Sequence, residues 1–535
     1  MASFPSLLPS SFSSTPLYMY LLYGSLSLLA IAVYKAHSIG KRDPRMPPGP
    51  PTVPLLGNAL QIPKTGLGKK FRSWADQYGS VFSLTIGPRN IVVVCDRKAA
   101  NAMLDKKGSK YSDRPFTYVT DYITHGDRLT MENATPAWRE RRAIVSRNLS
   151  PKVLDEKHFV IQEAEAVLFM NNVLRRPERM FDLARLYTAS VASTLIWGQR
   201  TKDLDSFWYK EFYELMDLWV TIEEAGANPP MDEFPILKWI PGAAWKKRAD
   251  KCSEMQNTMW TTARAIIDKR RARGDKRDCF IDTKLDEYEA KGFPMSQHAF
   301  NNLFGVLLEA GADTTANQIL TIILALAKNP EIQKRARKEI DAVCGTDRAP
   351  LFSDFKELPY VNCIVKEGMR WRPTASAGLP HLCTQDDEYE GMLIPKGTTV
   401  FLGAWAIHHD EELYPNPEEF NPDRFLNHPK LAHEYSVGDF EKRDEYPTFK
   451  IFPDSKLTKR NMWRIAAKLL WAFDISEPID PKTGKVTSLD VNAYNSAVLL
   501  CPLPFNVDVV PRSKAHLACI ERELESAETY MAQWE

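Results

Sequence analysis

The sequence predicts a mainly α-helical domain with a small β region, placed behind a single N-terminal transmembrane helix. Apolar residues recur with helical periodicity in four long segments, at residues 155–176, 257–273, 297–328 and 461–474. Shorter stretches alternate between apolar and polar residues, as strands do, near 81–95, 378–401 and 503–510. An uncharged apolar segment precedes all of them.

That uncharged segment is residues 17–34, LYMYLLYGSLSLLAIAVY, and it is long enough to cross the hydrocarbon core of a bilayer. Four basic residues follow between 35 and 45, and the positive-inside rule places them in the cytoplasm. Residues 1–16 hold neither Lys nor Arg, so the charged region of a cleaved signal peptide is missing. We expect a retained anchor, with residues 1–16 on the lumenal side.

Residues 35–58 are rich in proline, including PRMPPGPP at 44–51. Dense prolines exclude helix and central strand, so this region is expected to be a stiff linker between the anchor and the body. Residues 59–510 show no repeat and no second linker, which predicts one large domain. A polar tail with a helical pattern follows at 511–535.

Composition excludes several classes of function. The chain of 535 residues has 69 basic and 68 acidic side chains, so nothing in its charge predicts a nucleic-acid partner. Its eight cysteines form no C-x-x-C pair, which argues against a disulfide framework. The neighbouring His408 and His409 cannot both face one ion from a helix or strand, and we predict no metal site from side-chain spacing.

The segment EAGADTT at 309–315 lies in the middle of the long apolar segment 297–328. A glycine and several polar residues weaken a helix interior, which favours a functional role. Gly311 would let a ligand approach the backbone, Thr314 can bond to a carbonyl or to that ligand, and Asp313 can accept or pass a proton. A polar helix that crosses between layers is the structural alternative.

Two further pairs share a predicted helix face. Glu367 and Arg370 are three residues apart in apolar surroundings, and a buried pair of this kind needs further partners. Arg424, in the sequence NPDRF, is the expected third member. Trp138 and Arg142 combine a flat ring with a cation, which suits a planar anionic cofactor. A surface arginine packed on a tryptophan explains that pair equally well.

In this order, W-x-x-x-R, A-G-x-D-T-T, E-x-x-R and P-x-R-F, behind an anchor and a proline-rich hinge, the chain resembles the cytochrome P450 family over residues 17–510. Pro380-His381, the sequence IPKGT at 394–398 and a closing strand at 504–507 add to the resemblance. It implies the cytochrome P450 fold, a haem b cofactor and monooxygenase activity.

The resemblance also implies roles for individual residues. Asp313 and Thr314 would be the catalytic pair that delivers protons during dioxygen activation. The remaining residues would surround the haem, at its propionates, beside its ring or on its thiolate side: Trp138, Arg142, His381, Gly311, Glu367, Arg370 and Arg424. The substrate pocket would be bounded by residues 111–130 and by the helix face that precedes Gly311.

Partners follow from the same resemblance. The chain carries no flavin or nicotinamide fingerprint, so electrons would come from NADPH through a separate membrane-bound cytochrome P450 reductase. The other reactants would be O₂ and a small lipophilic substrate. The motif wording is most similar to fungal endoplasmic-reticulum P450s of secondary metabolism, some of which oxidise aromatic or polyketide-type compounds. We therefore expect a single-pass protein of that membrane, with its catalytic domain in the cytoplasm.

The sequence departs from the family at the haem loop, F-x-x-G-x-R-x-C-x-G. Counted from Phe449, the positions of its glycine, arginine, cysteine and second glycine hold Phe452, Asp454, Lys456 and Thr458. A lysine ammonium is protonated and hard, and does not replace a thiolate. Cys501 comes after the helix, among expected strand residues at 497–500, on the wrong side to be the ligand.

Two hypotheses account for this departure. In the first, the gene model is faulty across this loop, because the change begins and ends abruptly while every other motif remains. In the second, the protein is a catalytically inactive P450-like membrane protein or the product of a decaying gene.

Overall fold

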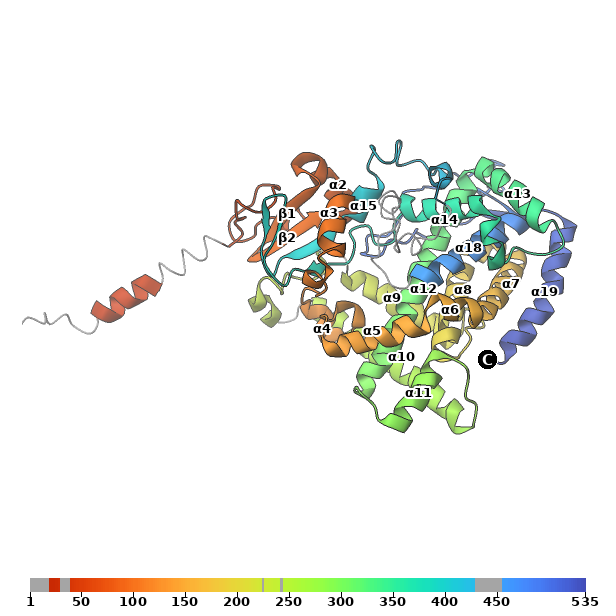
Figure 1. Ribbon diagram of the computed structural model, residues 1–535, viewed down its shortest axis with the longest axis horizontal. Helices are drawn as coiled ribbons and strands as arrows, with labels where there is room; N and C mark the ends of the chain where they lie inside the picture. Colours follow the sequence, from red (N-terminus) through yellow and green to blue (C-terminus); the bar gives the residue numbers. More distant parts are fainter. Residues whose placement is uncertain (1–18, 29–38, 224–225, 241–243, 429–454) are drawn as a thin grey trace, which may run out of the picture.

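The computed structural model describes residues 19–28, 39–223, 226–240, 244–428 and 455–535. A helical body makes up most of the molecule, and a small sheet with its own short helices lies at one end of it (Figure 1). The prediction of a mainly helical domain with a small β region is confirmed.

Three helices lie with the sheet: α2 (Leu67–Tyr78), α3 (Arg97–Ala100) and α15 (Ala404–His408). The first half of the body contains α4 (Tyr118–Thr124), α5 (Pro136–Asn148), α6 (Pro151–Glu156), α7 (Phe159–Arg175), α8 (Met180–Trp197), α9 (Phe207–Glu223), α10 (Ala244–Ala272) and α11 (Phe280–Lys291). The second half contains α12 (Gln297–Lys328), α13 (Pro330–Cys344), α14 (Pro359–Trp371), α18 (Ser455–Ala472) and α19 (Lys514–Ala532).

The main sheet has four strands in the order β1-β2-β6-β3. Its members are β1 (Val81–Ile86), β2 (Arg89–Val94), β6 (Thr399–Leu402) and β3 (His381–Leu382). β2 and β6 pair in parallel, with Ile91 opposite Thr399. These two strands are neighbours in the sheet, but most of the helical body lies between them in the sequence. Two-stranded pairs complete the β structure: β4 (Asp387–Tyr389) with β5 (Met392–Ile394), and β7 (Phe473–Ser476) with β8 (Asp508–Pro511).

Helix α12 is the centre of the body, and its bounds coincide with the predicted segment 297–328. The hydroxyl of Ser296 caps its first turn by accepting a hydrogen bond from the amide of Ala299. Nearly all of its side chains are buried, and it packs against α8, α14 and α18. At its contact with α10, Gly305 lies directly against the indole of Trp260.

Three expectations about the C-terminal third were wrong in detail. The helix expected at 461–474 is α18, which begins at Ser455 and ends at Ala472. Phe473 and Ile475 are buried in alternation with exposed neighbours, which is the periodicity of strand β7. The partner strand β8 begins only at Asp508, so residues 504–507 form no strand, and neither do residues 497–500.

At the N-terminus, residues 19–28 form a short helix with exposed apolar side chains, while the rest of the expected anchor, 17–18 and 29–34, lies outside the described residues. Within the described ranges, no helix is both long and apolar enough to cross a membrane. Residues 39–58 of the expected linker lie against the body. The Arg42 guanidinium donates to the carbonyls of Gly49, Pro50 and Ser83, which ties this segment to β1.

Candidate active site

Gly311, Asp313 and Thr314 lie at the middle of α12, and the helix runs through them without a break. The Thr314 hydroxyl donates to the carbonyl of Ala310, 2.6 Å away, so it takes the back-bonding alternative within the helix. Gly311 faces α8, where a Cβ on it would meet the Cβ of Ala192 at an ordinary 3.7 Å. The glycine is therefore not required by crowding at this contact.

Asp313 is a buried carboxylate that accepts a hydrogen bond from the side-chain amide of Asn317 at 3.3 Å. Burial raises the pKa of the Asp313 carboxyl to about 6, while the positive charge of Arg185 on α8 opposes that rise. Asp217 and Glu309 add negative charge nearby and push the pKa further up. A group with this pKa can take up and release a proton near neutral pH.

Asp313→Asn is expected to change how stability depends on pH. The folded chain keeps the Asp313 proton up to about pH 6, whereas the unfolded chain loses it near the ordinary value of 3.8. The stabilisation is present below the unfolded pKa and is lost as pH rises through about 6. In the unchanged protein the free energy of unfolding should fall by up to ~3 kcal/mol as pH rises from 3.8 to about 6, and Asp313→Asn should not show this fall.

Urea titrations at several pH values between 4 and 7 measure that decline. Asp121→Asn is the matched control, because Asp121 is exposed on α4. Curves for Asp313→Asn that run parallel to those of the unchanged protein would contradict the buried, proton-holding carboxyl.

A cationic cluster lies where the resemblance places the haem propionates. The Arg142 guanidinium lies 5.1 Å from the Trp138 ring, and the Trp138 indole donates to the carbonyl of Leu129. Burial and the neighbouring charge of Arg142 lower the pKa of Arg114 to about 10. Burial and Arg114 lower the pKa of His381 to about 4, and its Nδ1 lies 2.7 Å from the carbonyl of Tyr111.

Arg114 has an unfavourable environment, because it is largely buried beside Arg142 and forms no ion pair with a carboxylate in the part of the chain that the structure describes. An anion with two carboxylates would relieve their repulsion. This side of the site therefore fits the propionates of the haem that the resemblance implies.

On α14, Glu367 and Arg370 are fully buried and form a bidentate ion pair, with both nitrogen–oxygen distances at 2.7 Å. The Arg370 guanidinium also donates to the carbonyls of His408, Pro417 and Glu419. Arg424 lies 3.5 Å from the Glu367 carboxylate, and the backbone amide of Asn421 donates to the same oxygen. The structure thus brings the expected three residues together, with the additional partners that a buried pair requires.

The thiolate side of the site does not fit the haem. All eight cysteines are buried free thiols, and burial raises the pKa of every one of them. None belongs to α18, whose first turn takes up the last positions of the expected loop. The side chains there include Thr458, which shares a hydrogen bond with Thr315 of α12, and Lys459, whose pKa burial lowers to about 7. The chain as printed holds no group that could act as the thiolate ligand.

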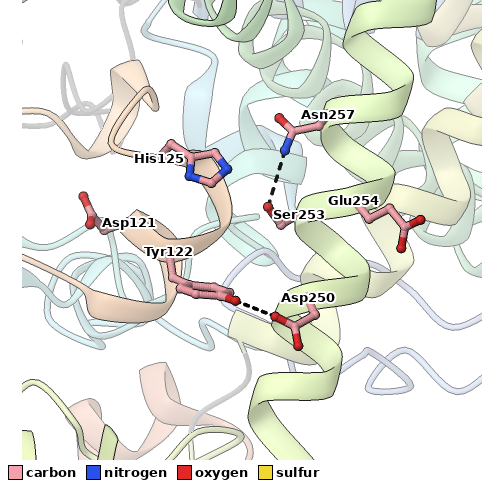
Figure 2. A pocket seen from close by; sticks show the side chains of 7 residues that line it. All are labelled: Asp121, Tyr122, His125, Asp250, Ser253, Glu254 and Asn257. Carbon is pink, nitrogen blue, oxygen red and sulfur yellow. Dashed lines mark hydrogen bonds between the residues drawn. The ribbon is translucent and has the colours of Figure 1, made fainter.

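A groove of about 580 Å³ lies between α4 and α10 (Figure 2). Its lining includes Tyr122, whose hydroxyl donates to Asp250, and both Tyr122 and Tyr118 pack against Trp245. Phe116, another aromatic residue of the expected wall at 111–130, is about half exposed. No residue of α12 lines this groove, so it is separate from Asp313.

Sequence reasoning missed three arginines of the site: Arg114 in the propionate cluster, Arg185 beside Asp313, and Arg128, which pairs with Glu309 at 3.0 Å. Arg114 precedes a proline, and Arg185 lies within an apolar helix. Each is a single cation without a motif, and only the packing of distant segments shows its partner.

Comparisons with known proteins identify the family of this chain. The sequence profile described as Cytochrome P450 matches residues 47–449. Cytochrome P450 monooxygenase acuD of Aspergillus aculeatus is 39% identical over 94% of this chain and 96% of its own length. Cytochrome P450 monooxygenase yanC of Aspergillus niger is 39% identical over the same shares, and patI of Aspergillus clavatus is 37% identical over 96% and 97%.

The two kinds of match end at different places. The family profile stops at Phe449, the first residue of the expected haem loop. A relative that covers 94% of the chain must continue well beyond that residue, into α18 and the segments after it. The chain therefore belongs to the cytochrome P450 family of haem-iron monooxygenases, and by that membership it is an enzyme.

Proposed function

We propose that the natural protein is a haem-dependent monooxygenase that oxidises a small lipophilic metabolite, aromatic or polyketide-type, in a pathway of secondary metabolism. We further propose that residues 450–459 as printed replace its cysteine-bearing loop through an error in the gene model. The first statement is carried by relatives named as cytochrome P450 monooxygenases that match nearly the whole chain. The second is carried by the end of the family match at Phe449 in a chain that such relatives cover to 94% or more.

The structure supports this proposal because the parts around the loop are intact. Asp313 is buried with a pKa of about 6, the propionate cations converge, and the Glu367–Arg370 pair is complete. A chain released from selection would accumulate changes at such buried charges as readily as in one loop. The inactive alternative finds no support among the relatives, which are named as monooxygenases.

Sequencing the spliced transcript across the codons for Glu445 to Asn461 is the direct test. We expect a message that encodes glycine, arginine and cysteine in the family's spacing. Protein expressed from that message should bind haem and show the carbon monoxide difference spectrum of a thiolate-ligated haem. The chain as printed is the matched control and should not show that spectrum, because no thiolate is available.

The opposite result is equally clear. If the transcript encodes residues 450–459 as printed, and the purified protein lacks a thiolate-type spectrum, the monooxygenase proposal fails. The second hypothesis, an inactive P450-like membrane protein, would then take its place.

We also propose attachment to the endoplasmic reticulum by residues 17–34, with the body in the cytoplasm. An exposed apolar surface on the body supports contact with a membrane. Trp239 and Ile236 are 83% and 77% exposed, and the adjoining Phe234 lies against Gly87 of the β1–β2 turn. Gly57, near the exposed Leu60, bridges to Ile86 on the same side. Membrane fractionation of the full chain against a chain lacking residues 1–38 tests the attachment.

Electrons are proposed to come from NADPH through a separate cytochrome P450 reductase on the same membrane, with O₂ as the second substrate. A common membrane would hold the two proteins and a lipophilic substrate close together. Oxidation of NADPH that requires added reductase and candidate substrate checks this arrangement in the cysteine-bearing protein.

A further inference from the structure

Glu309 belongs to the EAGADTT segment, but the proposed function gives it no role. It lies one helical turn before Asp313, so both carboxylates are on the same face of α12. Its side chain is only 5% exposed, and its oxygen accepts a hydrogen bond from Arg128 at 3.0 Å. A buried carboxylate at this place needs such a partner.

Arg128 contacts two helices at once, α9 and α12. It immediately precedes the 3-10 turn Leu129–Met131, its guanidinium lies 4.3 Å from the ring of Trp219 on α9, and Glu223 at the end of α9 is 3.9 Å away. The side chain is 14% exposed. One guanidinium therefore faces two carboxylates from different helices, with an aromatic ring over its plane.

The surrounding charges are unbalanced. The groups that face Asp313 or Arg128 from every packed element include two guanidiniums, four carboxylates and three weakly acidic side chains: Arg128, Arg185, Asp217, Glu223, Glu309, Asp313, Tyr213, Cys252 and Cys501. Burial raises the pKa of Glu223 and of Asp217 as well as that of Asp313. Removal of either cation would leave four carboxylates facing a single guanidinium.

We infer that Arg128 is a positioning residue for Asp313: it neutralises the two carboxylates nearest to it, Glu309 and Glu223, and ties the end of α9 to α12 one turn from Asp313. The inference rests on the proposed role of Asp313 as the proton-holding group. It gives the segment 111–130, which was expected to bound the substrate pocket, a second role in balancing the charges around Asp313.

Infrared titration of the full chain tests the inference, because a protonated buried carboxyl absorbs apart from ionised ones. Asp313→Asn identifies the Asp313 band. Arg128→Gln should raise the pH at which Asp313 and the neighbouring buried carboxyls are half protonated by about one unit or more, because a positive charge is lost. Glu309→Gln should lower the Asp313 midpoint, since a negative charge is lost, and the double variant should return it toward the unchanged value.

Two controls separate charge from folding. Arg128→Lys keeps the charge and should leave the midpoint near its unchanged value. Arg179→Gln removes a guanidinium from a surface ion pair with Asp182 and should leave the midpoint pH of Asp313 unchanged. If Arg128→Gln does not fold, the downward shift in Glu309→Gln carries the test.

The outcomes distinguish the two proposals. If the Asp313 band is present but neither Arg128→Gln nor Glu309→Gln moves its midpoint more than Arg179→Gln does, the inference about Arg128 is overturned and Asp313 keeps its role. If Asp313→Asn removes no band, Asp313 holds no proton near neutral pH, and both statements fail.

Discussion

Arg370→Met is expected to lower the free energy of unfolding by about 3 to 5 kcal/mol, because it leaves the Glu367 carboxylate buried without its cation. Both side chains are 0% exposed, so water cannot replace the lost partner. The carbonyls of His408, Pro417 and Glu419 lose a donor at the same time. Chemical denaturation, or the yield of folded protein where the variant is too unstable, measures the effect.

The matched control is Arg335→Met on α13. Arg335 pairs with Asp423, and each of these side chains is 45% exposed, so the loss should be below about 1 kcal/mol. Similar losses in the two variants would show that burial of the Glu367–Arg370 pair has no special weight for stability.

Two glycine-to-alanine substitutions on α12 should affect the stability of the protein differently: Gly305→Ala should lower it and Gly311→Ala should not. Gly305→Ala would place a Cβ 2.3 Å from a ring carbon of Trp260, closer than any real contact. That indole cannot move aside, because it is 1% exposed and stacks on Trp197 with ring centroids 6.0 Å apart. We expect a loss of about 2 to 3 kcal/mol despite the better helix propensity of alanine.

Gly311→Ala is the control for that substitution, because it lies on the same helix and, among the described residues, its Cβ would meet only Ala192, at 3.7 Å. It should be neutral or stabilise the protein by up to ~1 kcal/mol through helix propensity alone. Thermal or denaturant unfolding of both variants measures the difference. A destabilised Gly311→Ala would show that a closer contact is made at this position than the structure gives.

Sequence reasoning predicted the central helix well because periodicity and capping are local properties. The apolar pattern at 297–328 gave both ends of α12, where Ser296 caps the first turn and Asn329 follows the last. The helix expected at 461–474 began six residues after the start of α18 at Ser455 and ended two residues after its end at Ala472. Its end was placed too late because Phe473 continues the apolar pattern, which pairing with β8 converts into a strand.

The site was predictable where the family motifs lie and not elsewhere. Glu367, Arg370 and Arg424 were expected together, and they lie within ion-pair distance. The contact between Arg128 and Glu309 joins residues 181 positions apart, and no local pattern marks either as the partner of the other. Isolated cations of this kind emerge only from tertiary packing.

The parallel pairing of β2 with β6 cannot form until long after β2 has been synthesised. Ile91 leaves the ribosome roughly 300 residues before its partner Thr399, a delay of about 15 to 60 seconds at ordinary elongation rates. During that time the β1–β2 hairpin has an unpaired edge, which is a template for incorrect pairing. The nascent chain therefore has to shield this edge, or have it shielded by a chaperone, until the last third of the chain is made.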